Sequence, residues 1–169
     1  MPTIFAVQML KSSSKGRAEM VRVRPGSAAD IPRFVEIAAH SVTSAQWSQG
    51  QYMQLFAPSP VQPRLTLVVE EDGQVVGFIV GRLIQKECEI ENVAVHGSAR
   101  RRGLGSRLLG EFLDLIRSRG GQEIWLEVRE SNLAARTLYE RWAFVETGRR
   151  KQYYSDPLEG ALILKFNFS

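Results

Sequence analysis

Residues 64–84 constrain the fold of this chain more than any other stretch. They read RLTLVVEEDGQVVGFIVGRLI, in which two runs rich in β-branched residues lie on either side of Asp72-Gly73. An Asp-Gly pair between two such runs is typical of the tight turn that joins antiparallel strands. The sequence therefore predicts an antiparallel β-hairpin near the middle of the chain, around which the other segments must be arranged.

The segments on either side of the hairpin alternate between strand patterns and helix patterns. Apolar residues recur at helical spacing after Asp30 and again through 105–119. Besides the hairpin, we expect strands at 21–24, 88–96, 122–128, 144–154 and 161–168, and helices at about 30–38, within 44–63, at 105–119 and at 132–142. The order β-α-α-β-β-β-α-β-α-β-β predicts a single α/β or α+β domain.

Length, charge and cysteine content narrow the class of protein. The chain has 169 residues, of which 44% are hydrophobic, and this suits one domain with a packed core. Its single cysteine, Cys88, excludes an internal disulfide and fits a cytoplasmic protein. No apolar run approaches the ~20 residues of a membrane helix. The net charge of +4 is concentrated at 100–102 and 149–151, which favours a local anion site over nucleic-acid binding.

The first twenty residues differ in composition from the rest. They lack the leading positive charge of a signal peptide, and KSSSKGRAEM is small, polar and basic. We expect residues 1–20 to form a flexible extension and residues 21–169 to form the domain. A second interpretation is that Met20 is the true start, since MVRVRPGSAAD already opens like a domain.

Residues 95–113, VHGSARRRGLGSRLLGEFL, place three arginines and two glycines directly before a helix. The start of a helix exposes unpaired N–H groups and a partial positive charge, and glycine lets an anion approach the backbone closely. The stretch is neither a Walker A loop nor a Rossmann fingerprint. It predicts a cradle for a pyrophosphate, the alternative being a basic turn in which glycine provides flexibility.

The motif RRRGLGSRLL resembles the acetyl-CoA signature of the Gcn5-related N-acetyltransferases (GNAT), Gln/Arg-x-x-Gly-x-Gly/Ala. With NVAV before it, and LEVRESNLAARTLYERWAF and Tyr153-Tyr154 after it, the chain resembles the ribosomal-protein alanine N-acetyltransferase (RimI-type) branch from about Val21 onward. The resemblance implies a mixed, mostly antiparallel twisted sheet flanked by helices. It also implies direct acetyl transfer from acetyl-CoA to a protein N-terminal α-amine, without a metal.

The resemblance further implies which residues bind acetyl-CoA. The strand backbone at 93–95 would meet the pantetheine arm, the loop at 100–106 would surround the pyrophosphate, and Asn132 would lie near the thiol end. Backbone N–H at the end of the same strand could polarise the thioester carbonyl. The predicted cofactor-binding residues are Val93, Ala94, Val95, Arg100, Arg101, Arg102, Gly103, Leu104, Gly105, Ser106, Asn132 and Tyr139. His40 and His96 are too isolated in sequence to suggest a metal site.

The chemistry of the reaction requires a base and an acid. An amine at neutral pH is mostly ammonium, so a base must remove a proton before attack. By resemblance this base is Glu127, on a strand whose alternation places Ile124, Leu126 and Val128 on the opposite face. Tyr139 occupies the family position of the phenol that protonates the leaving thiolate. Glu91 is the rival base, and strict alternation would give it the same strand face as Glu89, Val93 and Val95.

The acceptor is the part of the function that the sequence leaves open. By resemblance, residues 41–52 and Tyr153-Tyr154 would form the walls of an acceptor groove, although the tyrosines could be ordinary strand residues. A peptide or protein N-terminus, such as that of a ribosomal protein, is the first candidate acceptor. The alternatives are a small amine or a lysine side chain, or a module that binds acetyl-CoA without catalysis. We expect negative charge at the acceptor site from Glu89, Glu91 or Glu127, no nucleic-acid or membrane contact, and a monomer or homodimer.

One position departs from the family pattern. Ala143-Phe144 stands where the family usually has Gly-Phe, at the end of the helix expected at 132–142. Glycine there adopts the left-handed conformation that ends a helix, and alanine in that geometry costs about 1 kcal/mol. We therefore expect the end of this helix to differ slightly from that of the family, a departure that concerns stability more than chemistry.

Overall fold

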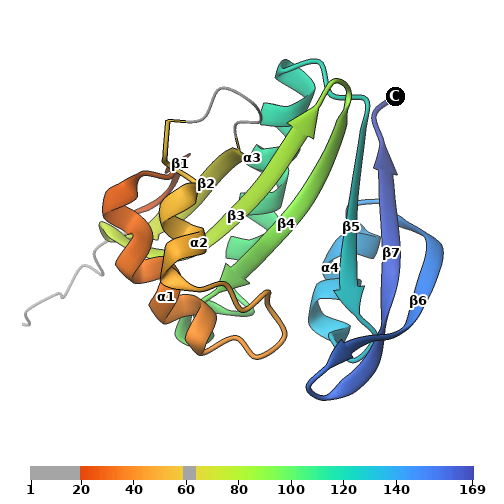
Figure 1. Cartoon of the computed structure of the whole chain (residues 1–169). Coiled ribbons are helices and arrows are strands. Elements are labelled where there is room, and N and C mark those ends of the chain that lie inside the picture. The colour runs from red at the N-terminus through yellow and green to blue at the C-terminus, as the bar shows by residue number, and fades with distance from the viewer. Residues whose placement is uncertain (1–19, 59–63) are drawn as a thin grey trace, which may run out of the picture.

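The computed structural model describes residues 20–58 and 64–169 (Figure 1). The extension expected at 1–20 lies outside these ranges except for Met20, and so do Pro60 and Pro63. Within them the helices and strands follow the predicted order β-α-α-β-β-β-α-β-α-β-β. Two short 3-10 turns, Ala28–Asp30 and Gly97–Ala99, precede α1 and α3.

The elements closely follow the ranges expected from the sequence. They are β1 (Val21–Pro25), α1 (Ile31–Ala39), α2 (Gln49–Gln54), β2 (Arg64–Glu71), β3 (Gln74–Ile84), β4 (Glu87–Val95), α3 (Leu104–Ser118), β5 (Glu123–Arg129), α4 (Leu133–Arg141), β6 (Val145–Ser155) and β7 (Leu158–Asn167).

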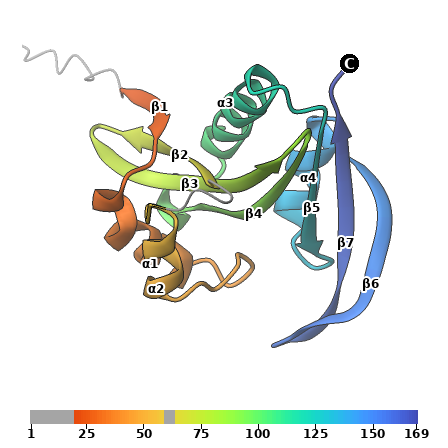
Figure 2. The same cartoon turned by 45° about the horizontal axis from the view of Figure 1, so that its top comes forward.

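The seven described strands form one sheet in the order β1-β2-β3-β4-β5-β7-β6. β4 and β5 pair in parallel, and the other described neighbours pair antiparallel. Helices α1 and α2 cover one face of the β2–β4 half, while α3 and α4 lie on the other face of the sheet (Figure 2). The mixed, mostly antiparallel sheet flanked by helices is therefore confirmed.

The hairpin predicted at 64–84 is the β2–β3 pair. Glu71 pairs with Gln74, so Asp72-Gly73 forms a two-residue turn. Both turn residues have positive φ, 49° for Asp72 and 83° for Gly73. Positive φ at both central residues defines the type I′ turn, whose twist matches that of the strands it joins.

A buried core lies on each face of the sheet. On one face, Phe34 of α1 packs against Phe78 of β3 with ring centroids 4.6 Å apart. On the other face, α3 packs its apolar stripe on β3, β4 and β5. There a Cβ at Gly81 would lie 2.6 Å from Cζ of Phe112, so glycine at this position allows α3 to approach the sheet closely.

The sheet divides between β4 and β5, and this division positions the site. Their parallel pairing runs from Glu87–Glu123 to Ile90–Leu126 and stops there, although both strands continue. Figure 1 shows the two strands diverging beyond that point. The same place in β4 carries a bulge, because Gly81 pairs with Ile90 while Val80 pairs with Asn92. Glu91 is the extra residue.

The end of α4 closes through its unusual alanine. Ala143 has φ of 61°, and the N–H of Phe144 donates to the carbonyl of Tyr139 at 3.0 Å. This is the left-handed closure of a helix. Ala143 therefore adopts the glycine-favouring conformation in spite of its Cβ.

We predict that Ala143→Gly raises the free energy of unfolding by about 1 kcal/mol, because it relieves the left-handed strain of a residue with a Cβ. Urea unfolding of the two proteins measures the change. Gly120→Ala is the matched control of opposite sign: φ is 82° and an added Cβ meets nothing within 4 Å, so only backbone strain is introduced. An unchanged or lowered stability of Ala143→Gly would contradict the prediction.

Candidate active site

Two cavities meet where β4 and β5 diverge. The larger, about 800 Å³, lies between the end of β4, the loop before α3 and the start of α4. The smaller, about 390 Å³, lies between β4, β5 and the β6–β7 hairpin. Residues from three parts of the fold line both cavities: Thr43, Ser44, Val93, Asn132, Ala135 and Leu138. A molecule in the larger cavity can therefore reach into the smaller one.

The larger cavity contains the predicted anion cradle. Gly103 caps α3 in the left-handed conformation, with φ of 76°, and Arg101 just before it has φ of 60°. These dihedrals turn the chain so that α3 begins at the cavity wall, where its first N–H groups are available. Leu104 is buried under the loop and fixes this start.

The three consecutive arginines have different surroundings. Arg101 lines the larger cavity. Arg100 also lines it, but its Nε donates to the carbonyl of Val95 at 3.0 Å and its Nη2 to Oγ of Ser41 at 2.7 Å. Arg102 is absent from the lining and forms a bidentate ion pair with Glu71 of β2. The charge of the run is therefore not all directed at one ligand.

Most other predicted cofactor residues also line the larger cavity. These are Val93, Ala94, Val95, Gly103, Leu104, Gly105, Ser106 and Asn132. The hydroxyl of Ser106 accepts a hydrogen bond from Trp142 Nε1 at 2.9 Å. Asn132 caps α4, and its Oδ1 accepts the N–H of Ala135 at 3.2 Å. Tyr139, the remaining predicted residue, lines the smaller cavity.

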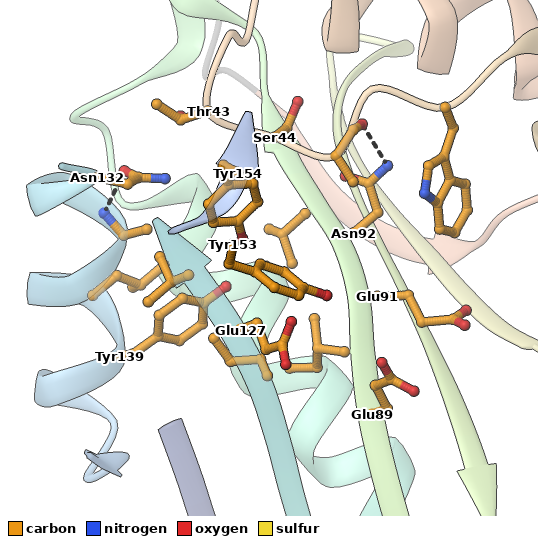
Figure 3. A pocket seen from close by; sticks show the side chains of 18 residues that line it. Thr43, Ser44, Glu89, Glu91, Asn92, Glu127, Asn132, Tyr139, Tyr153 and Tyr154 are labelled. Carbon is orange, nitrogen blue, oxygen red and sulfur yellow. Dashed lines mark hydrogen bonds between the residues drawn. The ribbon is translucent and has the colours of Figure 1, made fainter. Parts of the chain in front are cut away.

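The smaller cavity brings together the predicted base and acid. Glu127 on β5 and Tyr139 on α4 both line it, with Tyr153 and Tyr154 above them (Figure 3). The face of β5 agrees with the sequence prediction, because Ile124, Leu126 and Val128 are buried on the opposite side. Glu127 is ion-paired with Nε of Arg150 on β6.

Tyr139 is held in an apolar setting. Its side chain is buried, packs on Phe144 at 5.3 Å between ring centroids, and turns its hydroxyl into the cavity (Figure 3). Burial raises the pKa of this phenol above the ordinary value of about 10. The group therefore stays protonated at any physiological pH.

Glu91 lines the same cavity because of a strand bulge that the sequence does not reveal. We expected it to share a strand face with Val93 and Val95, and this is wrong, because the bulge shifts the alternation at Glu91. Val93 and Val95 pack toward the α3 core, whereas Glu91 pairs with Arg64 of β2 at 2.5 Å.

Three arginines, two of which the sequence analysis did not single out, lie beside the carboxylates of the smaller cavity. Arg64 pairs with Glu91, Arg82 pairs with Glu89 at 2.8 Å, and Arg150 pairs with Glu127. Each carboxylate lining the smaller cavity therefore has a guanidinium beside it. Only the basic run at 149–151 gave a sequence signal for one of these partners.

Similarity to known proteins agrees with this arrangement. The model of the Acetyltransferase (GNAT) family matches residues 33–144. The chain belongs to the GNAT acetyltransferase family. It is accordingly an N-acetyltransferase, and the acetyl donor in this family is acetyl-CoA.

Individual relatives and solved structures resemble the chain over most of its length. The chain is 33% identical over 144 residues to the ribosomal protein bS18-alanine N-acetyltransferase of Escherichia coli K12, covering 83% of this chain and 93% of that protein. The Haemophilus influenzae enzyme of the same name is 36% identical over 135 residues, covering 79% and 87%. The crystal structure of Ard1 from Thermoplasma volcanium superposes with a TM-score of 0.78 at 33% identity, covering 88% and 98%.

Two further observations concern what the described residues do not form. Residues 20–58 and 64–169 contain no group of three or more His, Cys, Asp or Glu side chains arranged to hold a metal ion. Across the same ranges, no helix is long and apolar enough to cross a membrane.

Cys88 is buried, which raises the pKa of its thiol to about 12.

We predict that kcat stays constant on the alkaline side up to pH of about 10, because burial keeps the Tyr139 phenol protonated there. The measurement is the pH dependence of kcat with saturating acetyl-CoA and acceptor. Tyr139→Phe is the control, and its residual activity should show no alkaline change in the same range. A fall of wild-type kcat near pH 9 that disappears in Tyr139→Phe would assign an ordinary or lowered pKa to the phenol.

Proposed function

We propose that this protein acetylates the free N-terminal α-amine of a peptide or protein, with a ribosomal protein as the acceptor. The observation that carries the proposal is the meeting of the two cavities, with Glu127 and Tyr139 on the walls of the smaller one. The relatives named as ribosomal-protein alanine N-acetyltransferases support the same acceptor class.

The larger cavity suits acetyl-CoA in shape and charge. The strand backbone at 93–95, which lines this cavity, would hold the pantetheine arm. The start of α3, together with Arg101, would face the pyrophosphate. Acetyl-CoA supplies the thioester acetyl group that the amine takes. Asn132 lies where the cavities join, and its capping role fixes the start of α4 beside that point.

The residues of the smaller cavity would accept and donate the protons that move during acetyl transfer. Glu127 would accept the proton that the attacking amine loses, directly or through water. Tyr139 would give its hydroxyl proton to the departing sulfur, and its buried position favours the neutral donor. Glu91 remains the rival base, since it also lines this cavity.

The charges around the cavity favour an N-terminal amine over a polyamine. A polyamine carries several positive charges and is bound best by carboxylates that have no cation of their own. Here Glu89, Glu91 and Glu127 each have an arginine partner. A single α-ammonium group, with a pKa of about 8, also loses its proton more readily at neutral pH than a lysine side chain, with a pKa of about 10.4.

We predict activity on peptides with free N-termini, tested with Ala, Ser, Met and Gly as first residues, beside a lysine peptide with a blocked N-terminus and spermidine. Glu127→Gln and Tyr139→Phe should each lower kcat by about 100-fold or more, because each removes one proton transfer. Steady-state acetylation with acetyl-CoA measures both.

Glu91→Gln is the matched control for the choice of base. It should retain most of kcat if Glu127 is the base, whereas the reverse pattern would assign the base to Glu91. Turnover of spermidine or the lysine peptide alone would overturn the proposed acceptor and keep the mechanism. Binding of acetyl-CoA without turnover on any acceptor would overturn the catalytic proposal.

A second prediction tests the charge argument. Arg82→Gln leaves Glu89 with less compensation, so kcat/KM for spermidine relative to an N-terminal peptide should rise by about fivefold. Competition assays with both acceptors in one reaction measure the ratio, and Arg22→Gln, which alters an ion pair on β1, is the control. A ratio that does not move would show that these pairs do not set acceptor selection.

A further inference from the structure

The segment between α1 and α2 forms a wall shared by the two cavities. Residues 41–45 of this segment have no helix or strand structure, and Thr43 and Ser44 line both cavities. In Figure 3 these two residues lie across the opening from Asn132 of α4. Because Thr43 and Ser44 line the smaller cavity, an acceptor bound there lies beside this wall, and the position of the wall affects how the acceptor binds.

The wall is held by side chains from both cavities, Arg100 from the larger one and Asn92 from the smaller one. Arg100 Nη2 donates to Oγ of Ser41 at 2.7 Å and lies 3.5 Å from the carbonyl oxygen of His40. Asn92 of β4 donates from Nδ2 to the carbonyl of Ala45 at 3.2 Å. These two contacts join the ends of the segment to β4 and its following loop, while Gln46 Nε2 braces the segment from within by donating to the carbonyls of Ser41 at 2.9 Å and Ser44 at 3.2 Å.

The contact at Ser41 is of a kind that holds a position well. Ser41 is only 4% exposed, so the bond from the charged guanidinium reaches a buried hydroxyl. Arg100 Nε simultaneously donates to the carbonyl of Val95 at the end of β4. The guanidinium therefore bridges the cofactor strand and the α1–α2 segment, with two of its three nitrogens engaged inside the protein.

We propose that Arg100 is a positioning residue that sets the acceptor wall through Ser41, and that its charge is not the phosphate contact. Arg101 lines the same cavity and makes no hydrogen bond or ion pair with the residues at 20–58 and 64–169, so it is left as the arginine that faces the cofactor phosphates. The inference rests on the proposed function and explains how the wall between α1 and α2 is held in place.

Arg100→Gln separates the two contacts. The glutamine amide nitrogen is as many bonds from Cα as arginine Nε, so it can still donate to Val95 but cannot reach Ser41. We expect the KM for the acceptor to rise about tenfold, and the Kd for acetyl-CoA to stay within about twofold. Ser41→Ala should give a similar rise, and the double variant should be no worse than either single one.

Arg101→Gln is the matched control, because it removes the neighbouring charge of the same loop. It should raise the Kd for acetyl-CoA, measured by calorimetry, and leave the acceptor KM nearly unchanged. Ser41→Ala keeps the test available should Arg100→Gln fold poorly, since it removes only one hydroxyl. Thermal unfolding of every variant shows that the fold is retained.

Two outcomes would overturn the proposal. Weakened acetyl-CoA binding in Arg100→Gln with an unchanged acceptor KM would make Arg100 a phosphate ligand. Additive effects of Arg100→Gln and Ser41→Ala would show that the two residues act separately. The acceptor used is whichever amine the panel identifies, so failure of the peptide assignment leaves this test intact.

Discussion

The divergence of β4 from β5 is the constraint on which the rest of the site depends. Two paired strands satisfy each other's backbone groups, and here the pairing ends at Ile90–Leu126 while both strands continue. The open edges of β4 and β5 then border the two cavities. A peptide-like ligand arm can occupy the place of the missing strand pairing, which is why a sheet can hold an extended cosubstrate at its interior.

The bulge at Glu91 makes that divergence compatible with two cores. Before the bulge, Cys88 and Ile90 pack toward α3; after it, Val93 and Val95 do so, while Ala94 packs toward α1. One extra residue therefore changes which side chains face each core without breaking the strand. The Glu91 carboxylate lies at the smaller cavity, where the guanidinium of Arg64 compensates its charge.

Local sequence patterns were sufficient to predict the helices and strands, but they did not predict which charged side chains pair with each other. The Asp72-Gly73 turn, the stripe of α3 and the alternation of β5 depend on neighbouring residues, and each was predicted from the sequence. The bulge could not be predicted, because an inserted residue shows only when two strands are in register. The pair between Glu127 and Arg150 likewise joins residues 23 positions apart through β7, so it depends on the register of three strands.

The arginine run shows why a motif does not assign its own side chains. Three identical residues in succession have three different surroundings, because the backbone turns sharply at Arg101, where φ is 60°. The turn sends Arg102 to Glu71 on one side and leaves Arg100 beside Ser41 on the other. What the motif secures is the conformation of the loop: Gly103 permits the left-handed cap, and the cap directs the start of α3 toward the ligand. Anion binding by such a loop depends first on backbone N–H groups, and each arginine contributes according to where the turn directs it.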